Sequence, residues 1–204
     1  MVRTVNAPFS TWPEAYHNVF LFVSSGSFAQ EEETNALYGA PPPADAVFIR
    51  IINISGELEI FGHSFNEIES ESADYMVLSA SNLSNVDAGL HYTVIPGPDG
   101  AVVIAEPVRD PSKVLVSLYN LGSDPVSLQM GDGSVEIIPP VAAGAAGYRE
   151  VNPLRVPLAV FTDSQILAPA REISLRRGED VSFIAQANGN VQILSSGYAE
   201  YDPK

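Results

Sequence analysis

The stretch VFIRIINIS at residues 47–55 recurs 67 positions later as VLVSLYNLG at residues 114–122. Alternate residues from Val47 to Ile51 are apolar and share one face of an extended chain, and the second copy repeats this face. The opposite face is mixed because it carries Arg50. An apolar face backed by a mixed one is typical of a strand in a β-sandwich.

A second match lies further along the chain, at an offset of 89 residues. It pairs GLHYTVI at 89–95 with GEDVSFI at 178–184, and DGAVVI at 99–104 with NGNVQI at 188–193. Asp-Gly and Asn-Gly tolerate the positive φ angles of tight hairpin loops, so each copy is predicted to close with a β-hairpin. The growth of the offset indicates about 22 extra residues in the middle of the second copy.

Short apolar runs separated by turn residues fill most of the remaining chain. The further strand candidates are residues 58–61, 75–78, 126–130, 135–138, 156–161 and 171–175. Gly131-Asp132-Gly133-Ser134 separates two of them and is expected to be a tight hairpin loop. No segment has a sustained 3.6-residue apolar period. The sequence therefore predicts an all-β fold of two tandem small β-sandwich domains, Ig-like or similar to carbohydrate-binding modules, related by internal duplication.

The expected domains are residues 37–108 and 112–204, joined by a proline-containing linker at 109–111, with the insertion in the middle of the second domain. Before them, Arg3, the apolar run at residues 19–23 and the small residues Ser27 and Ala29 indicate a signal peptide over 1–29. An acidic arm at 30–36 follows it. The alternative for this region is a disordered or strand-forming arm.

Composition excludes several classes of partner and chemistry. The net charge of −15 disfavours nucleic acid and anionic lipid. The absence of cysteine excludes disulfides, thiol nucleophiles and thiolate metal sites. No apolar run approaches the ~20 residues that span a bilayer, so no membrane span is expected.

The segment LYGAPPPADAVFIRIIN at 37–53 resembles the opening of the mature AlgF family, periplasmic proteins of alginate O-acetylation. The similarity resumes at residues 114–121 and at 148–153, in the family's order, and covers about residues 36 to 200. The resemblance implies a non-catalytic periplasmic accessory protein or adaptor that works with other O-acetylation proteins, most simply on alginate. Two alternatives remain: a carbohydrate-binding module that holds polymer near the acetyltransferases, and an accessory protein of bacterial cellulose acetylation.

Catalysis by the chain itself has little support in the residues. A serine acyltransferase needs a base and an orienting acid beside its nucleophile. After the predicted leader the chain offers only His63, expected in a loop, and His91, expected to face solvent because its counterpart in the second copy is Asp180. The GDGS stretch at 131–134 has no Asp-x-x-His partner later in the chain. We expect no enzyme activity and no cofactor.

Glu67, Glu69 and Glu71 alternate, with Asp74 close behind, and these residues could present oxygen ligands to calcium. A solvated edge that discourages strand aggregation is the preferred interpretation, so no metal is expected. Residues 37–108 hold ten acidic residues and one basic residue, which favours a basic protein partner. The residues considered for polymer or partner contact are Tyr148, Arg149, Arg155, Arg171, Arg176 and Arg177. Tyrosines, among them Tyr38, Tyr148, Tyr198 and Tyr201, could also stack on sugars, although half-buried strand ends are the preferred interpretation.

Overall fold

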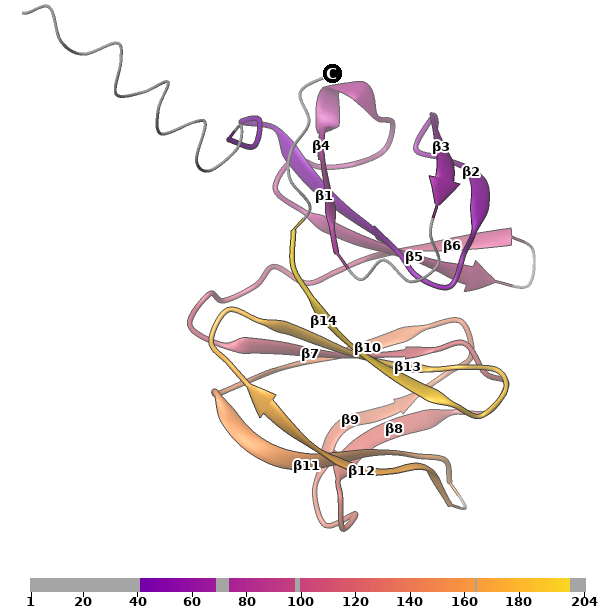
Figure 1. Ribbon diagram of the computed structural model, residues 1–204, viewed down its shortest axis with the longest axis vertical. Coiled ribbons are helices and arrows are strands. Elements are labelled where there is room, and N and C mark those ends of the chain that lie inside the picture. The colour runs from indigo at the N-terminus through magenta and orange to yellow at the C-terminus, as the bar shows by residue number, and fades with distance from the viewer. Residues whose placement is uncertain (1–40, 69–73, 98–99, 164, 199–204) are drawn as a thin grey trace, which may run out of the picture. The chain divides into compact units, whose positions relative to one another are not determined.

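The computed structural model describes residues 41–68, 74–97, 100–163 and 165–198. These residues form 14 strands and one short 3-10 helix, Ala80–Asn82, which confirms the predicted all-β class (Figure 1). The predicted leader and acidic arm lie outside the described residues. The chain from Tyr38 onward forms one compact unit. The predicted boundaries at 37–108, 109–111 and 112–204 stay a prediction.

The first sheet has the strand order β4-β1-β5-β6. Its strands are β1 (Ala46–Ile51), β4 (Met76–Ser79), β5 (His91–Gly97) and β6 (Gly100–Ala105). The two central strands, β1 and β5, are parallel, and both outer pairs are antiparallel. Val47, Ile49 and Val94 on one face of this sheet build an apolar cluster.

A two-stranded hairpin, β2 (Gly56–Ile60) and β3 (His63–Ile68), packs Leu58 and Phe65 on that cluster. The prediction that His63 lies in a loop is wrong, because His63 begins β3 and pairs with Ile60. Phe61 and Gly62 both adopt positive φ, at 55° and 70°. Such a two-residue turn reverses the chain at once, so the next strand begins directly after Gly62.

The second half forms two four-stranded sheets, ordered β10-β7-β13-β14 and β12-β11-β8-β9. The first contains β7 (Val114–Asn120), β10 (Ala146–Val151), β13 (Asp180–Ala185) and β14 (Val191–Ser196). The second contains β8 (Val126–Met130), β9 (Glu136–Val141), β11 (Leu154–Phe161) and β12 (Ile166–Leu175). The turn at 131–134 joins β8 to β9 as predicted, with Met130 N donating to Val135 O at 2.9 Å.

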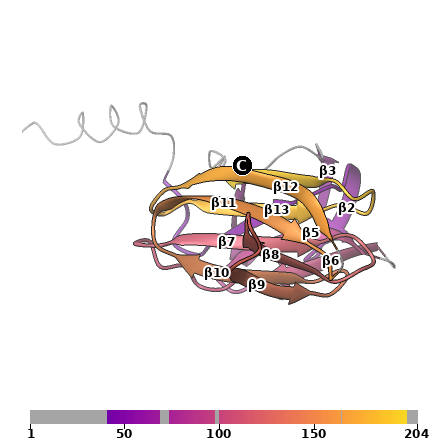
Figure 2. The same ribbon diagram turned by 90° about the horizontal axis from the view of Figure 1, so that it is seen from below.

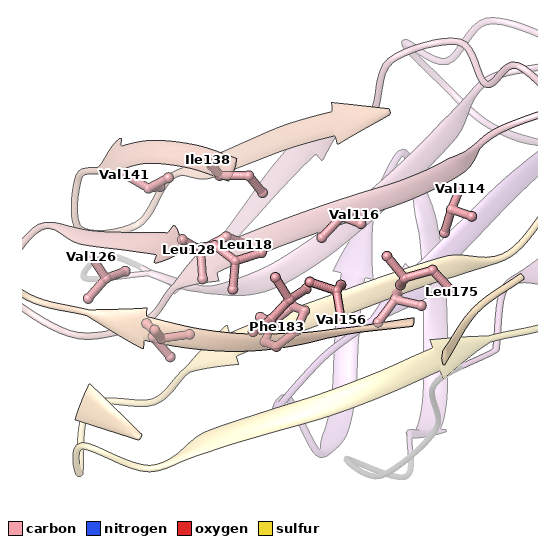
Figure 3. Close-up of a cluster of buried hydrophobic side chains, with 14 residues drawn as sticks. Val114, Val116, Leu118, Val126, Leu128, Ile138, Val141, Val156, Leu175 and Phe183 are labelled. Atoms are coloured by element: carbon pink, nitrogen blue, oxygen red, sulfur yellow. The ribbon is translucent and has the colours of Figure 1, made fainter. Parts of the chain in front are cut away.

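These two sheets enclose an apolar core (Figure 3). Val116, Leu118 and Phe183 from one sheet meet Leu128 and Val156 from the other. Figure 2 shows strands of the two sheets running in roughly aligned directions, as in an aligned β-sandwich. The inward face predicted for residues 114–118 is confirmed, because Val114, Val116 and Leu118 all belong to this core.

The sheets β4-β1-β5-β6 and β10-β7-β13-β14 share their strand pattern and their central register. Phe48 pairs with His91, and Leu115 pairs with Asp180, in parallel in both sheets. The sequence offsets of 67 and 89 residues relate these same positions. In the sequence, strands β8 to β12 lie between the two central strands of the second sheet, whereas only β2 to β4 lie between those of the first. The additional strands account for the predicted insertion. Common descent of the two sheets stays a prediction.

The central strands are buried on both faces. Ile52 and Ile95 pack with Tyr119 and Ile184 in a further cluster, and every residue of β7 is buried. The mixed face of β1 is therefore covered by the second half of the chain. This arrangement places Arg50 inside the protein.

Candidate functional site

Arg50 is the centre of a buried polar cluster, and its side chain has no solvent exposure. Its guanidinium lies 3.2 Å from Glu106 Oε1 and 3.7 Å from Asp180 Oδ2. It also donates hydrogen bonds to hydroxyl oxygens of residues on both halves of the chain: Thr93, Tyr119, Ser182 and Ser196. A buried arginine requires such a full set of acceptors, because an unpaired buried charge is strongly unfavourable.

Arg109 reaches the same carboxylates from the segment after β6. Its Nη2 lies 2.6 Å from Glu106 Oε2 and 2.9 Å from Asp180 Oδ2, and its side chain is 17% exposed. The Tyr75 hydroxyl lies 2.8 Å from Glu106 Oε1 and from Asp180 Oδ2. The Tyr75 ring also faces both guanidiniums, whose central carbons lie 4.6 and 4.8 Å from the ring centre. Two arginines thus balance two carboxylates.

The surroundings of the cluster fix the protonation states of its acidic and phenolic groups. Burial alone would raise the pKa of Glu106, but Arg50, the hydrogen bond from Thr93 and Arg109 outweigh it and lower that pKa. Burial raises the pKa of Tyr75 and of Tyr119 well above the ordinary tyrosine range, so both hydroxyls stay protonated donors. The cluster therefore holds a fixed pattern of charges and protons.

The cluster joins strands of two different sheets. Arg50 and Thr93 belong to β1 and β5, whereas Tyr119, Asp180 and Ser182 belong to β7 and β13. Removing one partner of a buried ion pair typically costs about 3–5 kcal/mol. These polar contacts therefore fix how the two sheets meet.

Sequence reasoning missed this cluster. The sequence pattern did not mark Glu106, or Arg109 in the predicted linker at 109–111, as members of a cluster. The expectation of a solvent-facing position for His91 and its counterpart is wrong for Asp180, which is 1% exposed, and His91 is half-buried. One signal was present: Arg50 is the single basic residue between 37 and 108 and stands between apolar neighbours in a strand. Buried strands tolerate such a residue only with partners.

His91 lies beside the cluster in an aromatic group. Its ring stacks on Phe48 with centroids 4.4 Å apart, and its Nε2 lies 3.1 Å from the Tyr198 hydroxyl. Burial, followed by the nearby Arg109, lowers the pKa of His91 to about 4. His91 is therefore neutral near pH 7, and its hydrogen-bond partner among the described residues is a tyrosine and not a serine.

The serines of the cluster are bound to its charged groups. Ser117 Oγ and Ser182 Oγ lie 2.8 Å apart, and each lies within 3.3 Å of Asp180 Oδ1. Both are completely buried. Neither makes a hydrogen bond to a histidine in the part of the chain that the structure describes. Ser134 donates to Asp132 Oδ1 at 2.6 Å within the β8–β9 turn, as expected for a hairpin loop.

The acidic series predicted as a solvated edge falls largely outside the described residues, because 69–73 are not described. Within the described ranges, no group of three His, Cys, Asp or Glu side chains is placed to hold a metal ion. In the same ranges no helix is long and apolar enough to cross a membrane.

The structure divides the basic candidates between two sheets. Arg149 is exposed on β10, whereas Arg155 on β11 and Arg171 on β12 belong to the other sheet. Arg155 forms an ion pair with Glu172, and Arg176 and Arg177 are exposed in the turn after β12. Tyr148 is half-buried with its ring against Tyr119, centroids 6.1 Å apart. Tyr198 is 54% exposed, and Tyr38 and Tyr201 lie outside the described residues.

A cavity of about 630 Å³ opens where several strands end. Three of its lining side chains are carboxamides: Asn53 after β1, and Gln186 and Asn188 in the β13–β14 turn. Leu121 and Pro96 supply apolar surface, and none of the lining residues is charged. The cavity can offer hydrogen bonds to an uncharged group but no cation to a carboxylate.

The fold and the cluster define an all-β protein of stacked sheets held together by a buried, charge-balanced polar centre. A family model described as "Alginate O-acetyl transferase AlgF" matches residues 20–182. The chain belongs to this family, which confirms the resemblance inferred from the sequence.

Individual relatives agree with the family match. The alginate biosynthesis protein AlgF of Pseudomonas aeruginosa is 26% identical over 185 residues, covering 83% of this chain and 86% of that protein. The protein of the same name from Azotobacter vinelandii is 29% identical over 181 residues, covering 81% and 83%. Solved structures of the C-terminal domain of AlgF from P. aeruginosa match with 29% identity and a TM-score of 0.37, covering 41% of this chain and 96% of that one.

Proposed function

We propose that the protein is a non-catalytic accessory component, an adaptor, of exopolysaccharide O-acetylation, that its polymer is alginate, and that it works in the periplasm. The family name supports O-acetylation, and the names of the relatives support alginate. The observation that carries the non-catalytic role is the closed state of the cluster. Ser117, Ser182, the tyrosines and the two carboxylates are buried, and they bind one another and Arg50.

Acetyl transfer by a serine requires a base that removes the hydroxyl proton and a path for the polymer to the acetylated oxygen. Ser117 and Ser182 have no exposed surface, so a polysaccharide hydroxyl cannot approach either oxygen. The Glu106 carboxylate is held as a charge partner of Arg50, which, against the effect of burial, contributes to lowering its pKa, so it is a poor proton acceptor for a general base. The cluster has the properties of a structural centre.

The predicted leader at 1–29 supports export to the periplasm. The partners proposed are the other periplasmic and membrane proteins of O-acetylation. Residues 37–108 carry a net charge of −9, with ten acidic residues against one basic residue, which suits a partner with a basic surface.

Two measurements test this proposal: the acetyl content of the polymer made in cells, and the acetyl chemistry of the purified protein. In an alginate-producing strain that lacks this gene, the wild-type chain is expected to restore acetyl groups on the polymer, and so are the variants His63→Gln and His91→Gln. The purified protein should release no acetate from p-nitrophenyl acetate above the buffer rate, and mass spectrometry should find no acetyl-serine. A stoichiometric acetyl-serine, or acetylation lost in either folded histidine variant, would show that the protein performs the chemistry.

Periplasmic placement is tested separately. Spheroplast fractionation should release the chain with the periplasmic fraction, and deletion of residues 1–29 should retain it in the cytoplasm. Recovery of the full chain in the cytoplasm would contradict this part of the proposal without affecting the non-catalytic role.

A further inference from the structure

Strand β6 is an unusually unprotected sheet edge. It is the outer strand of β4-β1-β5-β6, and its sequence, GAVVIA, has no charged residue and no proline. Its pairing with β5 runs without a register shift from Tyr92↔Ala105 to Gly97↔Gly100. Natural sheet edges are usually protected by charges, prolines, bulges or short length, because free edges recruit other strands.

Most of the other outer strands of the four-stranded sheets show such protection. Strand β4 has only four residues, and β9, β10 and β12 each carry charged residues, with prolines in β9 and β12. Strand β14, VQILSS, like β6, has no charged residue and no proline. Strands β6 and β14 are therefore the two exceptions among these edges, and β6 is the one that lies in the acidic stretch 37–108.

The register shows which backbone groups of β6 face outward. Glu106 N donates to His91 O at 2.9 Å, so the even-numbered positions of β6 bond to β5. The N–H and C=O groups of Ala101, Val103 and Ala105 then point away from the sheet. Within the described residues, none of these three N–H groups has a hydrogen-bond partner outside the β5–β6 ladder.

Two side chains of β6 pack on the interior of the protein. Val102 and Ile104 pack against the cluster that includes Tyr119 and Ile184. On the opposite face Ala101 and Ala105 are exposed and Val103 is 39% exposed. The strand is thus anchored through one face while its outer edge and other face remain open to a partner.

We propose that the outer edge of β6 is a docking site that binds an extended, positively charged segment of another protein of the acetylation machinery as an additional strand. This rests on the proposed adaptor function. Backbone hydrogen bonds to Ala101, Val103 and Ala105 would give affinity, as in other strand-addition complexes.

The net charge around β6 favours a basic segment of another protein over a second copy of the chain. Residues 37–108 have a net charge of −9, and their single basic residue, Arg50, is buried against Glu106. Two copies paired through β6 would bring two such acidic halves together, which is unfavourable. A segment rich in lysine or arginine is attracted by the same charge.

The test uses the full chain in cells that make the polymer. A photo-crosslinking residue, p-benzoylphenylalanine, replaces Ala101, and a matched control replaces Val135, which is 51% exposed before β9. We expect the Ala101 probe to crosslink another protein of the acetylation machinery through a peptide of net positive charge, and the Val135 probe to give only background. Val103→Pro removes an outward N–H without removing a bond to β5, so it should reduce the Ala101 crosslink to background.

Val103→Lys should weaken the same crosslink by charging the edge, and Val103→Thr, which keeps the β-branched shape and the free N–H, should retain it. Thermal unfolding checks that each variant is folded. A crosslink to a second copy, to residues 1–40 of the same chain or to an acidic peptide overturns the proposal, as does an absent crosslink in a folded protein. If folded Val103→Pro keeps both crosslink and polymer acetylation, the docking site fails and the adaptor role stands. An acetyl-serine on the chain would instead remove the proposed function.

Discussion

The guanidinium of Arg50 and the carboxylate of Glu106 meet at 3.2 Å with neither side chain exposed to solvent. Arg50 lies in β1, and Glu106 directly follows β6. The same guanidinium donates to Ser182 in β13, at 3.0 Å, so one side chain bridges two sheets. Because a buried charge without a partner is costly, each member of the cluster fixes the position of the others.

Replacing Arg50 by methionine should therefore destabilise the protein strongly. The change keeps an apolar stem of similar length but leaves Glu106 and Asp180 with Arg109 as their only cation in the cluster. The expected loss is about 3–5 kcal/mol in the free energy of unfolding. Urea unfolding followed by circular dichroism measures it.

The matched control is Arg155→Met, because Arg155 forms an exposed ion pair with Glu172. Exposed pairs contribute about 1 kcal/mol or less, so this variant should unfold close to the wild type. The double variant Arg50→Met with Glu106→Gln should lose less than the sum of the single losses. Equal effects at Arg50 and Arg155 would contradict the structural role of the cluster.

The lowered pKa of His91 predicts a specific dependence of stability on pH. Burial, followed by Arg109, lowers the pKa of His91 from 6.5 to about 4 in the folded protein. Between these values the unfolded chain binds a proton that the folded chain does not, so stability should fall as the pH drops from 6.5 to 4. Below pH 4 this contribution is fully lost and stays constant.

The variant His91→Gln should flatten the curve in that window, whereas Asn152→Gln, which replaces an exposed residue that does not titrate, should leave its slope unaltered. Midpoints of urea unfolding measured at half-unit pH steps provide the comparison. A slope between pH 4 and 6.5 that persists unchanged in His91→Gln would exclude His91 as its source.

The sequence pattern predicted the apolar parts of the fold better than the polar ones. Strand β8 was predicted with the bounds observed, Val126–Met130, because its apolar residues alternate between turn signals. Strand β10 was missed, since Gly147, Arg149 and Glu150 lower its strand propensity and its position depends on pairing with β7.

The candidate site was the least predictable feature. An alternating pattern marks which residues share a face, but it does not reveal that the mixed face of β1 is covered by β7 and β13. Glu106, Arg109 and Asp180 come from three separate segments, and only the tertiary arrangement brings them to Arg50. The repeated sequence pattern predicted matching strands and hairpins in the two copies, but not the contact between the sheets.

Gly147 lies where β10 packs closely against β9. A Cβ atom at this position of β10 would lie 2.5 Å from Ile138 Cγ2 and 2.8 Å from Val141 Cγ2, both on β9. Gly147→Ala should therefore cost about 1–3 kcal/mol through overpacking. Ile138→Ala removes the closest methyl group, so adding Gly147→Ala to that variant should cost less than adding it to the wild type. Thermal unfolding of the four proteins gives the comparison, and strict additivity would contradict the contact.

Asn120 organises the loops at the end of β7. Its buried amide donates to Asp124 O at 2.8 Å and to Val141 O at 2.9 Å, and its Oδ1 accepts from Gly122 N. Asn120→Ala leaves these backbone groups without partners and should cost about 2–3 kcal/mol. Asn152→Ala, at an exposed asparagine, should change the free energy of unfolding by about 0.5 kcal/mol or less. Similar losses in the two variants would show that the Asn120 bonds contribute little.

Oligomannuronate should not bind the purified protein at about 0.15 M ionic strength, where charges are screened beyond about 8 Å. The polymer is anionic, the chain has a net charge of −15, and the lining of the 630 Å³ cavity has no charged residue. Arg155 is paired with Glu172, and Arg149 belongs to a different sheet from Arg171. A titration of the ¹⁵N-labelled protein should give no saturating shift changes. Saturating shifts at Arg171, Arg176 and Arg177 would instead support a carbohydrate-binding module, provided that they disappear when the three arginines are changed to glutamine. An adaptor that works through protein contacts has no need to hold the polymer.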